Sequence, residues 1–206
     1  MKRTVRVVVF LSFACAALAT FSNSAQAQKV DLAFGVSTMV APSATSCGSC
    51  DGNPYVPQSL TGGAYPGFSG DFLFWHNLGF GAEVFWRAAS SQNYLDGAFG
   101  PVNFRPVFYN FNAVYAAKVA PHIAVELVGG VGGSDTHFSQ SSVFGNSGVI
   151  STSNHFDGDF GGGVKLYAHG GFFIRPEARF YIIHNETNYS ANHATRVGAS
   201  IGYTFK

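Results

Sequence analysis

The sequence is poor in charged residues and in cysteine. Asp, Glu, Lys and Arg make up 11% of the 206 residues, against about 25% in an ordinary soluble domain. The 12 basic and 11 acidic residues nearly cancel, so the chain lacks the basic excess that is typical of nucleic-acid binding. Beyond the first 27 residues no apolar run approaches about 18 residues, which argues against a bundle of membrane-spanning helices.

Aromatic residues and glycine are abundant instead. The chain contains 21 Phe, 9 Tyr and 25 Gly, and aromatic residues make up 16% of the total. A chain this rich in apolar side chains can bury enough surface to fold, so the shortage of charge does not indicate disorder. Mean hydropathy is only +0.13, because polar residues are interleaved with the apolar ones along most of the chain.

The first residues have the three regions of a secretory signal peptide. Lys2, Arg3 and Arg6 precede an apolar run over residues 7–21, and the small-x-small sequence Ala25-Gln26-Ala27 follows. A run of about 15 apolar residues is shorter than the roughly 20 that a spanning helix needs. This difference favours a signal peptide, cleaved after Ala27, over a membrane anchor.

The remainder of the chain alternates apolar and polar residues with a period of two, which indicates β-strands. In the clearest segment, 172–182, Ile174 and Phe180 fall on one face while Arg175 and Arg179 fall on the other. Eight such strands are predicted, over residues 30–40, 64–75, 80–89, 103–118, 123–133, 155–168, 172–184 and 195–206.

The predicted connections alternate between tight and long. The tight ones are 76–79, 119–122 and 169–171, and the long polar ones are 41–62, 90–102, 134–154 and 185–194. An up-and-down barrel that inserts into a membrane from one side has short turns at one rim and long loops at the other. The pattern therefore predicts an all-β fold, an eight-stranded antiparallel up-and-down transmembrane barrel.

The side chains on the apolar face decide which way that face points. A soluble, lipocalin-like barrel would place this face inside, around a ligand. The interior of an eight-stranded barrel is just wide enough for ordinary side chains, and the aromatic residues here are too bulky for it. We therefore expect the apolar face to point toward lipid. Its aromatic members are Phe34, Phe72, Phe74, Phe80, Trp86, Tyr109, Phe111, Tyr115, Phe160, Phe172, Phe180, Tyr203 and Phe205.

These features together resemble the small outer-membrane β-barrels of Gram-negative bacteria, such as the OmpA-type transmembrane domain and the OmpX-type proteins. The resemblance covers residues 28–206 and includes the aromatic-rich closing sequence Gly202-Tyr203-Thr204-Phe205, although Lys206 places the terminal aromatic one position early. It implies a monomer in the cell outer membrane, with membrane lipid and the barrel-assembly machinery as partners. It implies no cofactor and no nucleic-acid partner.

Two segments are predicted on this basis. Residues 1–27 form a signal peptide, and residues 28–206 form one outer-membrane β-barrel domain. The sequence ends with the eighth strand, so we expect no peptidoglycan-binding domain of the kind that follows some OmpA-type barrels.

Charged residues on the polar face are the main candidate site. Buried charges must be paired or hydrated, so we predict a salt-bridge network that plugs the lumen, with a water-filled interior as the alternative. Its acidic members are Asp71, Glu83, Glu126 and Glu177, and its basic members are Arg87, Lys165, Arg175 and Arg179.

The two cysteines beyond the signal peptide form a CxxC sequence, Cys47-Gly48-Ser49-Cys50, in the first long connection. Such a pair can be redox-active, supply half of a zinc site or form a disulfide. The oxidising cell envelope favours a loop disulfide between Cys47 and Cys50, and a free or metal-binding pair is the alternative. We predict no catalytic, cofactor-binding or metal-binding residue.

The predicted function is structural or interaction-based, namely envelope integrity or contacts made by the loops, without enzymatic activity. One alternative is a narrow pore or small-molecule porin. Another is an outer-membrane lipid-modifying enzyme that uses His184, which shares the lipid-facing phase with Ile182. That enzyme would need a hydroxyl nucleophile beside the histidine, whereas the facing positions of the next strand are Val197, Ala199 and Ile201.

Overall fold

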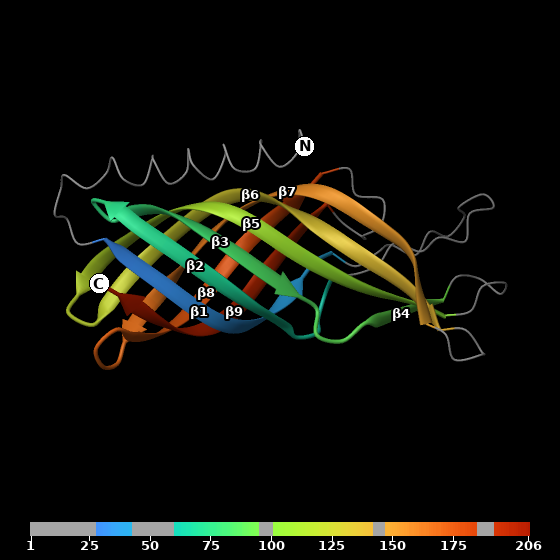
Figure 1. Ribbon diagram of the computed structural model, residues 1–206, viewed down its shortest axis with the longest axis horizontal. Helices are drawn as coiled ribbons and strands as arrows, with labels where there is room; N and C mark the ends of the chain where they lie inside the picture. Colours follow the sequence, from blue (N-terminus) through green and yellow to red (C-terminus); the bar gives the residue numbers. More distant parts are fainter. Residues whose placement is uncertain (1–27, 43–59, 95–100, 142–146, 185–191) are drawn as a thin grey trace, which may run out of the picture.

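The computed structural model describes residues 28–42, 60–94, 101–141, 147–184 and 192–206. Within them, nine antiparallel strands form one sheet (Figure 1). The strands are β1 (Lys29–Val40), β2 (Tyr65–Trp75), β3 (Leu78–Trp86), β4 (Ser91–Tyr94), β5 (Pro101–Ala120), β6 (Ile123–Ser141), β7 (Ser147–Tyr167), β8 (Phe172–Ile183) and β9 (His193–Phe205). None of the described residues belongs to a helix long and apolar enough to cross a membrane.

The sheet closes on itself as a barrel of eight strands. Neighbours pair in the order β3-β2-β1-β9-β8-β7-β6-β5, and pairing of β3 with β5 joins the two ends. The short strand β4 follows β3 after a break and pairs with the same partner, β5. It therefore continues the line of β3 rather than adding a ninth position to the wall. The predicted fold class is confirmed.

Tight turns lie together at one end of the barrel, at the left of Figure 1. We call this the lower end. His76 and Asn77 connect β2 to β3 with φ of 44° and 71°, the left-handed values that a two-residue hairpin turn of type I′ requires. Pro121 and His122 connect β5 to β6, whose last pair is Ala120 with Ile123. The short connections thus occur where the sequence predicts them.

At the opposite, upper end the structure corrects the prediction of long connections. The segment 134–154 is not a loop, because pairing of β6 with β7 continues from Ser134 with His155 to Ser141 with Ser147. Part of 90–102 is likewise strand, since β4 pairs with the start of β5. Outside a membrane both faces of a sheet can be polar, so these segments lack the alternation that identifies the rest of the strands.

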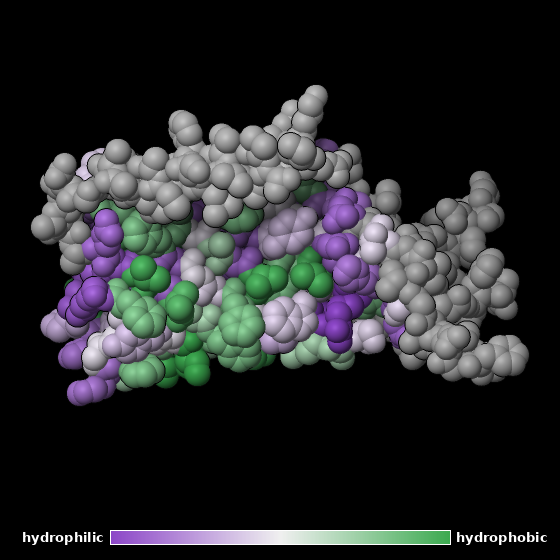
Figure 2. Space-filling view, viewed as in Figure 1, coloured by the Kyte–Doolittle hydropathy of each residue, from purple (hydrophilic) through white to green (hydrophobic). Residues whose placement is uncertain are grey.

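The outer wall of the barrel is apolar, as predicted. Phe80, Phe111 and Phe172 are each more than 60% exposed, and the other aromatic residues predicted to face outward are exposed or half-buried. On the face that Figure 2 shows, apolar side chains gather over the middle of the wall, with hydrophilic residues toward both ends of the barrel. Such a band between two polar rims is the outer surface of a transmembrane β-barrel.

Candidate functional site

The lumen is filled by charged side chains, and the lowest group of them surrounds Lys165 on β7. The ammonium group of Lys165 is fully buried and lies 2.6 Å from a carboxylate oxygen of Asp31 and 3.6 Å from one of Asp71, and it also contacts Glu126. These three carboxylates lie within 4.8 Å of one another, a spacing that suits a bound cation. The ammonium group of Lys165 lies among them and supplies that positive charge.

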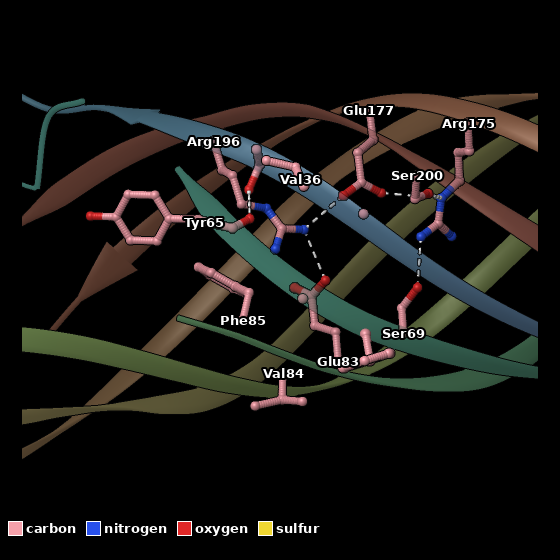
Figure 3. Close-up of a pocket in the computed structure, with 14 residues that line it drawn as sticks. Val36, Tyr65, Ser69, Glu83, Val84, Phe85, Arg175, Glu177, Arg196 and Ser200 are labelled. Atoms are coloured by element: carbon pink, nitrogen blue, oxygen red, sulfur yellow. Dashed lines mark hydrogen bonds and ion pairs between the residues drawn. The ribbon is translucent and has the colours of Figure 1, made fainter. Parts of the chain in front are cut away.

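Arg175 on β8 connects this group to the next level of the lumen, and Figure 3 shows it near Glu177 and the two serines Ser69 and Ser200. Its guanidinium lies 2.8 Å from Glu126 and 3.1 Å from Glu177. It also donates hydrogen bonds to the hydroxyl groups of Ser69 at 2.8 Å and Ser200 at 3.2 Å. One side chain thus ties β8 to three other strands of the wall, β2, β6 and β9.

Two further arginines share the carboxylates above Arg175. Arg196 on β9 donates to Glu83 at 2.8 Å and to Glu177 at 3.0 Å, and Figure 3 shows it between them. Arg179 on β8 lies 3.0 Å from Glu83 and 3.3 Å from Asp159. Because two arginines share Glu83 and three share Glu177, the charges form a connected network and not a set of separate pairs.

Aromatic side chains close the lumen above the ion pairs. The rings of Phe85 and Phe108 stack with centroids 4.8 Å apart, and Tyr181 packs against both and donates a hydrogen bond to Glu83 at 2.9 Å. The guanidinium of Arg196 lies 4.1 Å from the centroid of Phe85. We call this cluster the aromatic layer. Its members are Met39, Leu60, Tyr65, Phe85, Phe108, Tyr181, Ile183 and Ala194.

Solved structures resemble this barrel over most of the chain. A major outer membrane protein from Thermus thermophilus has a TM-score of 0.59 at 9% identity, covering 87% of this chain and 100% of its own. Neisserial surface protein A has a TM-score of 0.57 at 13% identity, covering 86% of this chain and 97% of its own. The attachment invasion locus protein Ail of Yersinia pestis, in complex with the heparin analogue sucrose octasulfate, has a TM-score of 0.53 at 14% identity. The match covers 86% of this chain and 99% of Ail.

The fold is that of a small outer-membrane β-barrel. No protein-family model matches the sequence, and no curated protein matches it either. At 9–14% identity the structural likeness establishes the barrel and leaves its activity to be argued from the side chains.

The barrel brings together seven of the eight charged residues predicted for its lumen. These are Asp71, Glu83, Glu126, Lys165, Arg175, Glu177 and Arg179. Arg87 is buried at a higher level, where it donates to the carbonyl of Thr61 at 3.3 Å. There its guanidinium lies over the rings of Tyr65 and Phe104, 5.9 and 5.6 Å from their centroids.

The prediction missed four charged residues that also lie in the lumen. They are Asp31, Asp157, Asp159 and Arg196. Each of these residues lies on the face of its strand that points into the lumen, so the alternation that located Lys165 and Arg179 would have found them as well. Asp157 is fully buried and accepts a hydrogen bond from Asn110 at 2.5 Å. With these residues included, the acids of the network outnumber its bases.

Glycine at inward positions provides the space that the network needs. A Cβ on Gly163 would lie 3.0 Å from Cγ of Arg175 and 3.2 Å from Cβ of Glu177. A Cβ on Gly81 would contact the side chains of Asp71 and Val114. Substituents at these positions would therefore push against side chains that the ion pairs hold in place.

The other predicted features lie elsewhere. His184 is exposed just after β8, and its backbone nitrogen donates to the carbonyl of Phe156 at 2.9 Å. Cys47 and Cys50 fall within residues 43–59, outside the described residues, so their disulfide stays a prediction. The same holds for the signal peptide over residues 1–27.

Proposed function

We propose that this chain is a monomeric integral outer-membrane protein that acts without catalysis, through contacts made by a sheet at the cell surface. The observation that carries the proposal is the length of β5, β6 and β7, which have 20, 19 and 21 residues. A strand needs about 9–11 residues to cross a membrane. The excess extends the upper end of the barrel as a regular sheet, seen at the right of Figure 1.

One edge of this projecting sheet is suited to contact another chain. Pairing of β8 with β7 reaches up to Ile183 with Asp157. Along residues 147–155, β7 pairs with β6 on one side, while no described strand pairs with the other side. Backbone N–H and C=O groups along a sheet edge can pair with an extended segment of a partner. This supports a role in surface contacts.

The filled lumen supports the non-catalytic part of the proposal. The carboxylates that would serve as acids or bases are at most 11% exposed, and Arg or Lys side chains occupy the space between them. A substrate entering the lumen would have to displace ion pairs that are already made. The interior charges therefore suit stabilisation of the barrel better than chemistry.

Surface labelling of whole cells tests the proposed location. Thr152 is exposed on the upper part of β7, and Ala168 is exposed in the lower turn. In a Cys47→Ser, Cys50→Ser background, we expect a membrane-impermeant maleimide to label Thr152→Cys on intact Gram-negative cells and to label Ala168→Cys only after lysis. Labelling of Ala168→Cys on intact cells, or recovery of the protein in the soluble fraction, would contradict the proposal.

The two alternative functions have tests of their own. A pore would give stable channels in planar bilayers with the unmodified protein. A lipid-modifying enzyme would change the mass of lipid A when the protein is expressed, and His184→Ala would restore the original mass. We expect neither result.

A further inference from the structure

Below the Lys165 group the lumen contains a cavity of about 400 Å³ that opens at the lower end. We call it the vestibule. Its wall includes the apolar side chains of Leu73, Ala116 and Ala124, and a pair of hydroxyl groups, those of Tyr167 and Thr204, 3.2 Å apart. The volume is within the range of about 300–1,000 Å³ that is usual for small-molecule sites.

The vestibule is closed at its upper end. Phe173 is only 2% exposed, and its ring packs against Tyr167 with centroids 5.8 Å apart. The fully buried ammonium group of Lys165 lies 5.4 Å from the centroid of the same ring. A molecule that enters from below therefore meets Phe173 and the ion pairs above it, so the vestibule is a blind pocket and not the mouth of a channel.

The mouth of the vestibule carries basic side chains without acidic ones. Lys29, Lys118 and Lys206 line it together with His122 and His169. Within the described part of the chain, none of these five side chains has an ion-pair or hydrogen-bond partner. The described acids lie either in the lumen network above or at the upper end. The mouth of the vestibule therefore presents a group of unpaired basic side chains, and the α-carboxylate of Lys206 and the excess of acids in the lumen network above lower the positive potential that this group produces.

We propose that the vestibule binds a phosphate-bearing group, either on a soluble small molecule or on a lipid headgroup. Lysine ammonium groups act as compact point charges and are common phosphate ligands. The two hydroxyl groups can donate hydrogen bonds to phosphate oxygens, and the apolar wall can pack against the carbon atoms of the ligand. This site is separate from the projecting sheet and adds a binding activity at the opposite end of the barrel.

Titration with inorganic pyrophosphate tests the soluble form of this ligand. The full-length protein is placed in phosphatidylcholine nanodiscs at low salt, and binding is measured by isothermal titration calorimetry. Replacing Lys29, Lys118 and Lys206 with Gln removes three charges, of which that of Lys29 is half-buried and those of Lys118 and Lys206 are exposed. We expect this replacement to weaken binding about tenfold or more. Arg105→Gln is the matched control, because this exposed base at the upper end donates to the carbonyl of Ala88 at 2.8 Å and should leave binding unchanged.

A second pair of variants separates the cavity from the charge at its mouth. Ala124→Trp fills the vestibule while keeping every basic residue, and Leu73→Trp does the same from another strand if the first variant fails to fold. We expect either variant to weaken binding as strongly as the lysine replacements. Heat-dependent gel mobility, in which a folded barrel migrates differently from the boiled chain, confirms folding.

Phosphatidylglycerol nanodiscs test the lipid form. Native mass spectrometry after detergent extraction counts the lipids that stay bound. If the protein binds pyrophosphate, and both the lysine replacements and the cavity-filling variants weaken that binding, the ligand is a soluble molecule. If the protein retains phosphatidylglycerol, and both kinds of variant lose it, the ligand is a lipid headgroup. The proposal is overturned if neither probe binds, or if a folded cavity-filling variant binds as well as the unmodified protein.

Discussion

Each charged side chain in the lumen depends on several partners, and Arg179 illustrates the consequence. It is 2% exposed and lies between Glu83 and Asp159 at 3.0 and 3.3 Å. Arg179→Ala would leave two carboxylates competing for the remaining arginines. Breaking a buried pair in this way costs about 3–5 kcal/mol, less if water enters the lumen. We expect the variant to unfold at lower temperature, measured by heat-dependent gel mobility.

The neighbouring residue provides the control for this variant. Phe180 follows Arg179 on β8, lies on the lipid-facing side and packs against Phe160 with ring centroids 5.3 Å apart. Phe180→Leu keeps an apolar side chain against lipid and leaves the ion pairs intact, so its unfolding temperature should stay close to that of the unmodified protein. Equal effects of the two substitutions would mean that the lumen charges are hydrated and contribute little.

Gly163 permits a test of packing without removing any charge. A Cβ at this position would lie 2.9 Å from the carbonyl oxygen of Pro176, 3.0 Å from Cγ of Arg175 and 3.2 Å from Cβ of Glu177. Overpacking of this kind costs about 1–3 kcal/mol, and we expect Gly163→Ala to lower the free energy of unfolding by an amount in that range, measured by urea titration. Gly158→Ala on the same strand is the control, since its nearest contact would be the Gly130 carbonyl at 3.7 Å. A smaller loss for Gly163→Ala than for the control would refute this explanation.

For single residues, the sequence predicts which face of the strand a side chain lies on. Alternation alone gives the inward direction of Lys165 and Arg175. It does not give the partner of either, because partners come from distant strands: Lys165 pairs with Asp31, 134 positions earlier in the chain. Such pairs depend on the register of every intervening strand, which alternation within one segment does not specify.

At the scale of elements, the β6–β7 hairpin consists of a lower part within the barrel wall and an upper part beyond it. Thr136 pairs with Ser153 near the boundary between the two. We expect removal of residues 137–152, with Asn-Gly joining the cut ends as a two-residue turn, to leave a folded barrel. Retained heat-dependent gel mobility would show this, and its loss would mean that the projecting sheet is required for the barrel to form.

Below that boundary the strands were predicted well, and above it they were predicted poorly. Between membrane and lumen every strand must be apolar on one face and polar on the other, so the pattern is strong and the strands of the wall were found. Above the membrane both faces contact water, and the hydrophobic pattern that identifies a strand disappears. Segment 134–154 therefore reads as a polar loop, although its pairing is regular.

For the whole molecule, the lumen is closed twice along the same axis. The ion-pair network fills its middle, and the aromatic layer lies directly above, linked to it by the hydrogen bond from Tyr181 to Glu83 and by Arg196 over Phe85. Because the two barriers lie in series, ions can cross the lumen only when both are open. From this arrangement we predict that the barrel is closed to ions even though its vestibule is open below.

Planar-bilayer recordings of a variant series test this arrangement. We expect the unmodified protein to be closed to ions. Arg179→Ala should remain nearly closed because the aromatic layer is intact, and Phe85→Ala with Phe108→Ala should remain nearly closed because the ion pairs are intact. Combining all three substitutions should produce channels, and these should prefer cations, since acids outnumber bases in the lumen and removing Arg179 increases their excess. Open channels in the unmodified protein, or anion preference in the combined variant, would show that the side chains seen in the lumen are not what closes it.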